Sequence, residues 1–198
     1  MFAVVESGSI VSMPKGNKGI QIGDLKYPAS IFSLWTETER NAIGVYTVEI
    51  DNTNKKDDEW YVNTEITYSF GSGKVTGTYG TATAKAIEDA DAVDNEGNKL
   101  KDENGNQIIN EGLKTIKKRI IDNECAGLLA PSDWMVIKAT ETGTTMDSGW
   151  KTWRASVRTK CNSMQTQIDN ASDVDALAAL YERNDSGVRP LGDFPIKE

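Results

Sequence analysis

The spacing of apolar residues changes along this chain of 198 residues, and that change limits the possible folds most. In the first half, short runs such as "FAVVE", "VYTVEI" and "WYVNTEITYSF" are rich in the β-branched and aromatic residues of half-buried strands. In the second half, apolar residues recur three and four positions apart, as they do on one face of a helix. The sequence therefore predicts an α+β protein, with a β-rich N-terminal half and a helical C-terminal half.

Turn residues divide the first half into hairpins. A Ser-Gly pair separates "FAVVE" from "SIVSM", and Gly-Ser-Gly at 71–73 separates "WYVNTEITYSF" from "KVTGTYG". Between these hairpins, "TETERNAIG" has the signals of a short helix: Thr36 as its cap, Glu39 to complete a capping box, and Gly44 as its stop. We predict an antiparallel β-rich domain over residues 1–80.

Residues 81–108 are the predicted connector between the two halves. The connector begins with apolar residues at a weak helical spacing, which predicts a weak helix: Ala82, Ala86, Ala90 and Val93. After it, "DNEGNKL" and "DENGNQI" repeat one pattern, Asp-x-x-Gly-Asn-x-apolar, eight residues apart. Because Asn and Gly favour turns with positive φ, we expect an exposed hairpin or loop here.

Residues 109–187 are the predicted helical domain, which contains a helical hairpin. The first helix carries an apolar stripe at Ile109, Leu113, Ile116, Ile120, Ile121, Cys125, Leu128 and Leu129. Pro131 ends that helix, and Ser132 or Asp133 caps a short segment through "WMVIKA". The stripe of the second long helix comprises Trp150, Trp153, Val157, Met164 and Ile168, with Lys160 or Cys161 at the remaining step. A third helix, "DVDALAALYERN", is expected to be capped by Ser172, and residues 188–198 form an extended tail.

The composition excludes several kinds of chemistry. The chain has no histidine, so it has no Ser-His-Asp or Cys-His catalytic device and no imidazole metal site. Its formal charge of -8 would repel a phosphate backbone, and we expect no nucleic-acid partner. The two cysteines, Cys125 and Cys161, lack CxxC spacing and are interpreted as buried small hydrophobic residues. We expect no cofactor and no metal.

Three short motifs have simpler interpretations than a ligand site. "GSGK" at 71–74 lacks the Gly and the Ser or Thr that a phosphate-binding loop needs at positions 68 and 75. The acidic stretch 88–103 lacks the spacing of a calcium loop and is interpreted as a solvated loop. The basic cluster "KTIKKR" is expected to face solvent.

Membrane and export signals are not found in the sequence. No apolar run approaches the ~20 residues that span a bilayer, and "MFAVVESGSI" has no basic region of a signal peptide. We expect a soluble protein made in the cytosol, without a membrane partner.

Three of the five tryptophans, Trp134, Trp150 and Trp153, lie within one stretch of about thirty residues. Such large side chains fill a core, but Trp and Arg together also dominate protein interfaces, and both interpretations stay open. We expect Trp134 to fill the turn between the helices. Arg154 and Arg158 are expected to form a cationic edge beside the packed face, with Asp133 as a charge partner for one of them.

The segment "AGLLAPSDWMVIKATETGTTMDSGWKTWRASVR" resembles a pattern of bacteriophage tail-fibre assembly proteins. That pattern is LL-x-x-[ST]-DW, a variable loop, and then W-x-x-[YW]-R-x-x-[LV]-R. The matching positions are Leu128, Leu129, Ser132, Asp133, Trp134, Trp150, Trp153, Arg154, Val157 and Arg158. "FAVVESGSI" and "FSLWTETERNAIGVYTVEI" resemble the opening hairpin and short helix of the same proteins, and the overall style is similar to proteins of marine cyanobacterial phages.

The resemblance implies a non-enzymatic phage protein that binds tail-fibre or tail polypeptides, as a fibre assembly chaperone or a fibre-associated virion component. It implies a place in the host cytoplasm during assembly, or in the virion tail for members that remain bound. Alternatives are a permanent structural subunit of the tail or baseplate and, less favoured, a carboxylate-dependent glycan-active enzyme. A homo-oligomer is compatible with each.

The residue types give two groups of candidate positions. The predicted interface residues are Trp134, Trp150, Trp153, Arg154 and Arg158. The predicted structural residues of the motif are Leu128, Leu129, Asp133 and Val157.

Overall fold

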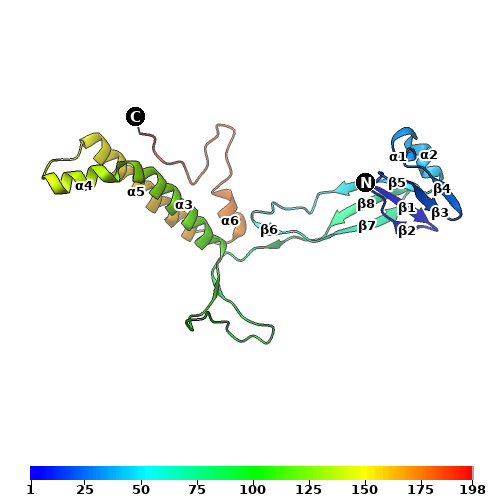
Figure 1. The fold of residues 1–198 in the computed structure, drawn as a ribbon, viewed down its shortest axis with the longest axis horizontal. Helices are drawn as coiled ribbons and strands as arrows, with labels where there is room; N and C mark the ends of the chain where they lie inside the picture. The colour runs from blue at the N-terminus through cyan, green and yellow to red at the C-terminus, as the bar shows by residue number, and fades with distance from the viewer. Residues whose placement is uncertain (198) are drawn as a thin grey trace. The chain divides into compact units, whose positions relative to one another are not determined.

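The structure, a computed structural model, describes residues 1–197 and confirms the α+β class (Figure 1). By its internal contacts the chain divides into two compact units, Met1–Thr83 and Ala84–Glu198. Strands dominate the first unit and helices the second. The predicted connector, residues 81–108, therefore belongs to the second unit from Ala84 onward.

The first unit is built around one five-stranded sheet. Its strands are β1 (Phe2–Glu6), β2 (Ser9–Ser12), β5 (Val45–Asp51), β7 (Ile66–Gly71) and β8 (Lys74–Tyr79), in the order β2-β1-β5-β8-β7. The pairs β1–β2, β1–β5 and β7–β8 are antiparallel, as predicted, but β5 and β8 run parallel. The sheet is therefore mixed, because the long segment between β5 and β8 lets the chain return in the same direction.

Each face of the sheet carries its own hydrophobic cluster. Along β1, Val4 points to one face and Ala3 and Val5 to the other, as the period of two requires. The Val4 face is covered by β3 (Ile20–Ile22), β4 (Leu25–Tyr27), α1 (Ile31–Leu34) and α2 (Glu37–Ala42). On the other face, the outer strands β2 and β7 approach each other, so the sheet curls around Val75 and its neighbours.

The predicted capping box starts α2. The Thr36 hydroxyl accepts the backbone N–H of Glu39 at 3.3 Å, and the Glu39 carboxylate accepts the N–H of Thr36 at 2.8 Å. Gly44 follows the helix with φ +78°, and a Cβ there would lie 2.6 Å from the carbonyl oxygen of Val5. Only glycine fits this stop, because both the left-handed φ and the close approach exclude a side chain.

The second unit contains the predicted helical hairpin. Its helices are α3 (Leu113–Leu129), the 3-10 turn η1 (Ala130–Ser132), α4 (Asp133–Thr142), α5 (Ser148–Asp169) and α6 (Val174–Ala179). Figure 1 shows α3 and α5 side by side, and they pack closely. Asp173, rather than the predicted Ser172, caps α6 by accepting the N–H of Ala176 at 2.8 Å. No helix within residues 1–197 is both long and apolar enough to cross a membrane.

The buried face of α3 differs from the predicted stripe at several positions. The buried residues are Leu113, Lys117, Ile121 and Cys125, whereas Ile120 is 50% exposed and Ile109 lies in a strand. Lys117 takes a core position because its stem is apolar and its ammonium lies 4.9 Å from the centroid of the Tyr181 ring. The prediction that the basic cluster "KTIKKR" faces solvent is therefore wrong for Lys117, which is buried.

The buried face of α5 comprises Arg154, Val157, Cys161, Met164 and Ile168, a strict 3-4-3-4 spacing. Cys161 occupies the step that the sequence left open, and the Lys160 ammonium instead donates to the carbonyl of Leu191 at 2.7 Å. Leu191 is fully buried, and its N–H donates to the carbonyl of Leu180 at 3.0 Å. Residues 188–197 of the C-terminal tail thus form no helix or strand, yet Leu191 anchors them against the helices.

The predicted weak helix at the start of the connector does not form. The segment contains two short strands, β9 (Thr83–Ala84) and β10 (Ala90–Asp91), and residues 86–89 run along the first turn of α3. The carbonyls of Ala86 and Ile87 accept the N–H groups of Leu113 and Lys114. Because these carbonyls satisfy the open end of α3, they are not available to a helix of their own.

The eight-residue repeat forms two copies of one loop. Asp94 accepts the backbone N–H groups of residues 96 and 98, and Asp102 accepts those of residues 104 and 106. Gly97 and Gly105 have φ +86° and +82°, the positive values that the pattern predicts.

A closed ring of backbone hydrogen bonds joins the two loops to their stem. The stem pairs β10 with β11 (Ile109–Asn110). Ala92 donates to Ile108 at 2.8 Å, Ile108 donates to Leu100 at 2.9 Å, and Leu100 donates to Ala92 at 2.8 Å. The predicted exposed hairpin is therefore a three-way junction held by backbone bonds.

Candidate protein-interaction surface

The helix α4 exposes apolar side chains around its circumference. None of its ten described residues is buried, and Trp134, Val136 and Ile137 are 55%, 42% and 58% exposed. A helix of a globular protein normally buries its apolar side chains against the rest of the fold. The apolar side chains of α4 are not covered in this way and remain exposed to solvent. The prediction that Trp134 fills the turn between the helices is therefore wrong.

The chain geometry around Pro131 explains why α4 is exposed. Pro131 has no N–H and lies in η1, so α3 ends at Leu129 and α4 starts as a separate helix. α4 approaches α5 much less closely than α3 does. Gly143, at φ +67°, ends α4, and the Asp147 side chain caps α5 by accepting the N–H of Trp150 at 3.1 Å.

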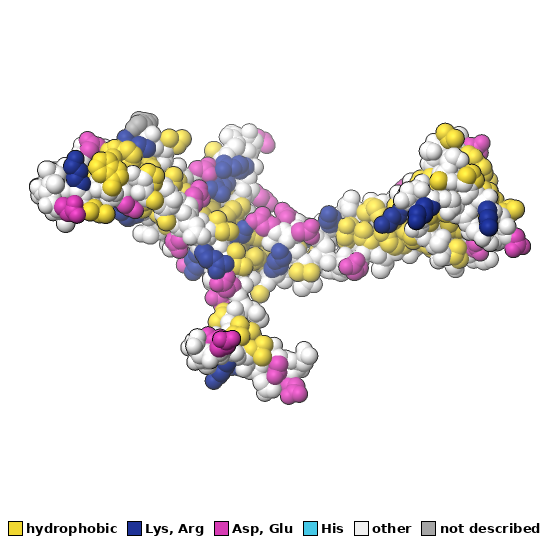
Figure 2. Space-filling model, viewed as in Figure 1, with side chains coloured by type: hydrophobic (Ala, Val, Ile, Leu, Met, Phe, Trp, Pro, Cys, Tyr) yellow, Lys and Arg dark blue, Asp and Glu magenta, His cyan; other side chains and the backbone are white. Residues whose placement is uncertain are grey.

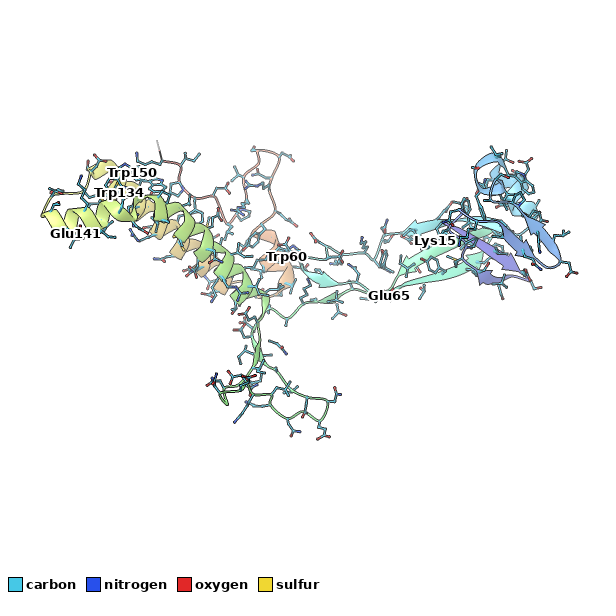
Figure 3. The ribbon with its side chains drawn as sticks, viewed as in Figure 1. Lys15, Trp60, Glu65, Trp134, Glu141 and Trp150 are labelled. Atoms are coloured by element: carbon cyan, nitrogen blue, oxygen red, sulfur yellow. The ribbon has the colours of Figure 1, made fainter. Side chains whose placement is uncertain are left out.

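Two hollows lie where α4 stands away from α5. The first, of about 510 Å³, is lined by Trp134, Met135, Lys138, Met146 and Trp150, among others. The second, of about 410 Å³, is lined by Val136, Ala139, Met146, Lys151, Arg154 and Arg158, among others. Figure 3 shows Trp134 and Trp150 next to each other at this end of the unit, and Figure 2 shows hydrophobic side chains gathered there. We call the exposed side chains of α4 together with these two hollows the α4 surface.

Trp150 and Trp153 are both half-buried and contact each other edge to face. Their ring centroids are 5.6 Å apart and the rings are nearly perpendicular. The Trp153 indole N–H donates to the carbonyl of Pro195 at 2.9 Å, and the Lys197 ammonium lies 5.3 Å from the Trp150 centroid. Trp153 therefore holds the C-terminal tail, while Trp150 also lines the first hollow.

Arg154 is buried, with 4% of its surface exposed, and it joins α5 to the start of α4. Its guanidinium donates to the carbonyl of Leu129 at 2.7 Å, to the Ser132 hydroxyl, and to the Asp133 carboxylate at 2.6 Å. The predicted ion pair with Asp133 is confirmed. The predicted cationic edge is not formed by Arg154, because its charge is neutralised and largely removed from solvent.

The remaining predicted positions divide between core and surface. Val157 is fully buried, Leu128 and Leu129 are half-buried, and Arg158 is exposed beside the second hollow. Ser132, which we predicted only as a cap and a motif position, is also fully buried and both accepts from Arg154 and donates to Leu129. The position of Ser132 in the motif, between Pro131 and Asp133, was the sequence feature that could have indicated this structural role. Met146 and Lys151 line the hollows and were missed.

The cysteines are poorly suited to nucleophilic chemistry. Cys125 and Cys161 are both buried and reduced. Burial and the neighbouring Cys125 raise the pKa of the Cys161 thiol from 9.0 to about 12, which disfavours the reactive thiolate. Within residues 1–197, no three His, Cys, Asp or Glu side chains gather closely enough to hold a metal ion.

The fold and this surface describe an α+β protein with an uncovered helix at one end of its helical unit. Compared with protein-family models, with curated proteins and with solved structures, the chain matches none of them. A suggestion of family therefore rests on sequence resemblance, chiefly on the motif of residues 128–158.

Proposed function

We propose that this chain is a non-enzymatic protein that binds another polypeptide through the α4 surface. The observation that carries the proposal is that α4 has no buried residue and yet exposes Trp134, Val136 and Ile137. Exposed large apolar side chains gathered on one element mark interaction sites, and tryptophan is among the residues most enriched in strong interface contacts. Partner binding would supply the cover that α4 lacks.

The proposed partner is a tail-fibre or tail polypeptide of a bacteriophage. The motif of residues 128–158 supports this choice, because it spans α4 and the residues that position it. Arg154 binds Leu129, Ser132 and Asp133, all of which match the motif. On this proposal the protein acts in the host cytoplasm, as an assembly chaperone of the fibre or as a component that stays bound to it.

Co-expression with a tail-fibre polypeptide of the phage that encodes the chain tests the proposal. The wild-type chain should raise the yield of soluble fibre trimer and should copurify with the fibre. The double variant Trp134→Ser/Ile137→Ser should lose both effects, since it removes apolar surface without opening a core. Leu34→Ser/Val188→Ser is the matched control, because both side chains are exposed and lie outside the α4 surface.

Two results would contradict the proposal: an unchanged fibre yield when the chain is omitted, or full activity of the Trp134→Ser/Ile137→Ser variant. Mass spectrometry of purified virions then separates the two forms of the function. A stoichiometric amount of the chain identifies a permanent component, and its absence identifies a chaperone that leaves after assembly.

A further inference from the structure

Two exposed cations border the second hollow of the α4 surface. Lys151 and Arg158 lie on α5, seven residues and therefore about 10 Å apart along the helix axis, and both line the hollow. Within residues 1–197 neither side chain has a carboxylate partner. Arg154 lies between them, but Asp133 neutralises its charge.

This pair of unmatched cations lies in a chain that is acidic overall. The sequence has 30 acidic residues against 22 basic ones, and many of its other cations are paired, as Lys118 is with Asp169 and Arg183 with Asp193. The hollow beside Lys151 and Arg158 is walled by the apolar side chains of Val136, Ala139 and Met146. An occupant that matches this site needs apolar side chains in the hollow and negative charge at its rim.

We propose that the α4 surface binds an acidic amphipathic polypeptide segment. Its apolar side chains enter the hollow, and two carboxylates spaced by about 10 Å pair with Lys151 and Arg158. The inference rests on the proposed function, since it specifies the chemistry of the segment that the α4 surface takes. Seven residues of helix provide the required carboxylate spacing on one face of the bound segment.

A second copy of this chain is a poorer occupant of the same surface. A symmetric dimer through one surface places the same patch of each copy against the other. Lys151 and Arg158 would then approach the same two cations of the partner copy, and the residues that line the second hollow include no carboxylate to compensate. Charge complementarity therefore favours a different polypeptide.

Selection from a random peptide library tests the inference without a known partner. The library is selected on the wild-type protein and counter-selected on Lys151→Glu/Arg158→Glu. The peptides retained should combine apolar residues with two Asp or Glu residues at the stated spacing. Synthesised individually, they should bind the variant about tenfold more weakly than the wild type, and binding should weaken with added salt.

The control variant Lys18→Glu/Lys26→Glu carries the same change in net charge, in the other unit, on two exposed side chains. It should bind the selected peptides as the wild type does. Circular dichroism and the melting temperature establish that both double variants are folded, which is expected because all four positions are exposed.

Several outcomes would overturn the inference: no enrichment over the counter-selection, enrichment of neutral or basic peptides, or equal binding to Lys151→Glu/Arg158→Glu. Dimerisation in the ultracentrifuge that this variant abolishes would identify a second copy as the occupant instead. Stronger binding to phosphatidylglycerol vesicles than to any selected peptide would identify a membrane.

The two proposals can fail separately. If Trp134→Ser/Ile137→Ser abolishes fibre binding but the selected peptides are not acidic, the inference fails and the proposed function stands. If acidic peptides bind at Lys151 and Arg158 while fibre yield never depends on the chain, the proposed function fails instead.

Discussion

The Arg154 guanidinium lies 2.6 Å from the Asp133 carboxylate and thereby fixes the first residue of α4 against the N-terminal end of the buried face of α5. The same guanidinium holds the end of α3 through the carbonyl of Leu129. One buried side chain therefore positions three consecutive helical segments. The exposed α4 surface depends on this link, because α4 has no buried residue of its own to hold it in place.

Replacement of Arg154 by Met should lower the free energy of unfolding by about 1–3 kcal/mol, because Ser132 and Leu129 lose their buried donor. Asp133→Asn should cost less than about 1 kcal/mol, since the Asp133 side chain is 57% exposed. Arg158→Met, the control on the same helix, should change stability by no more than about 0.5 kcal/mol. Urea unfolding measures all three. Equal losses for Arg154→Met and Arg158→Met would show that the buried network does not hold the helices.

The duplicated loops should titrate together at acidic pH. Hydrogen bonds from the backbone and the side chain of Asn98 lower the pKa of Asp94 below 3.8, and Asn106 does the same for Asp102. A lowered folded-state pKa means that the carboxylate stabilises the loop above about pH 3.8 and loses this effect as the pH falls through the folded value. Amide shifts of Asn98 and Asn106 in NMR spectra should therefore be constant above pH 4 and change in parallel below it.

The variants Asp94→Asn and Asp102→Asn serve as the controls for that titration. Each should remove the pH dependence of its own loop and leave the other loop unchanged, because an amide does not ionise in this range. A transition centred above pH 3.8 in the wild-type protein would contradict the direction of both pKa shifts.

Cys161 should resist alkylation in the folded protein. Burial is the main cause of its raised pKa of about 12, against an ordinary 9.0, and this cause remains when Cys125 is replaced, so the thiolate stays disfavoured near pH 8. In a Cys125→Ser variant, iodoacetamide should label Cys161 far more slowly in buffer than in urea, as followed by mass spectrometry. Similar rates in the two conditions would show that the thiol is accessible and ionised, contrary to its position on the buried face of α5.

The C-terminal tail should contribute to stability although residues 188–197 form no helix or strand. Leu191 is fully buried, and its truncation to Ala should lower the free energy of unfolding by about 2–5 kcal/mol. Val188→Ala, in the same tail, should have little effect because Val188 is 58% exposed. Thermal and urea unfolding provide the comparison. If both variants are as stable as the wild type, the tail does not pack on the helices in solution.

Local signals in the sequence predicted local structure well. The capping box of Thr36 and Glu39, the stop at Gly44 and the positive φ of Gly97 and Gly105 each depend on a few neighbouring residues, and all are present. The α+β class and the hairpin of α3 and α5 followed from the period of the apolar residues. These features depend on residues within one turn or one helix, so a local sequence pattern is enough to predict them.

The failures involve contacts between distant segments. The spacing of alanines predicted a helix near Ala86, but the carbonyl of Ala86 is used by Leu113, on the far side of the repeated loops. A hydrophobic pattern excludes Lys117 from the core, whereas Tyr181 stabilises its ammonium there. Parallel pairing of β5 with β8 leaves no short-range signal at all.

The sequence predicted which residue types lie near the α4 surface, but not which of them are exposed and which are buried. Residue types selected Trp134 and Arg158, which are exposed, and also Arg154, which is buried. The distinction depends on Ser132 and the carbonyl of Leu129, which turn toward Arg154 only because Pro131 interrupts the helix. Spacing alone does not reveal which of two arginines one turn apart takes the inner position.

The ring formed by Ala92, Leu100 and Ile108 fixes the number of loop copies. Most repeat arrays lengthen by adding units at an end, since each unit contacts only its neighbours. Here the last residue of the series bonds back to the first, so the circle closes with two loops and one stem. An added eight-residue unit would have to break one of these three hydrogen bonds. The element is therefore limited to two loops and cannot be extended into a longer array.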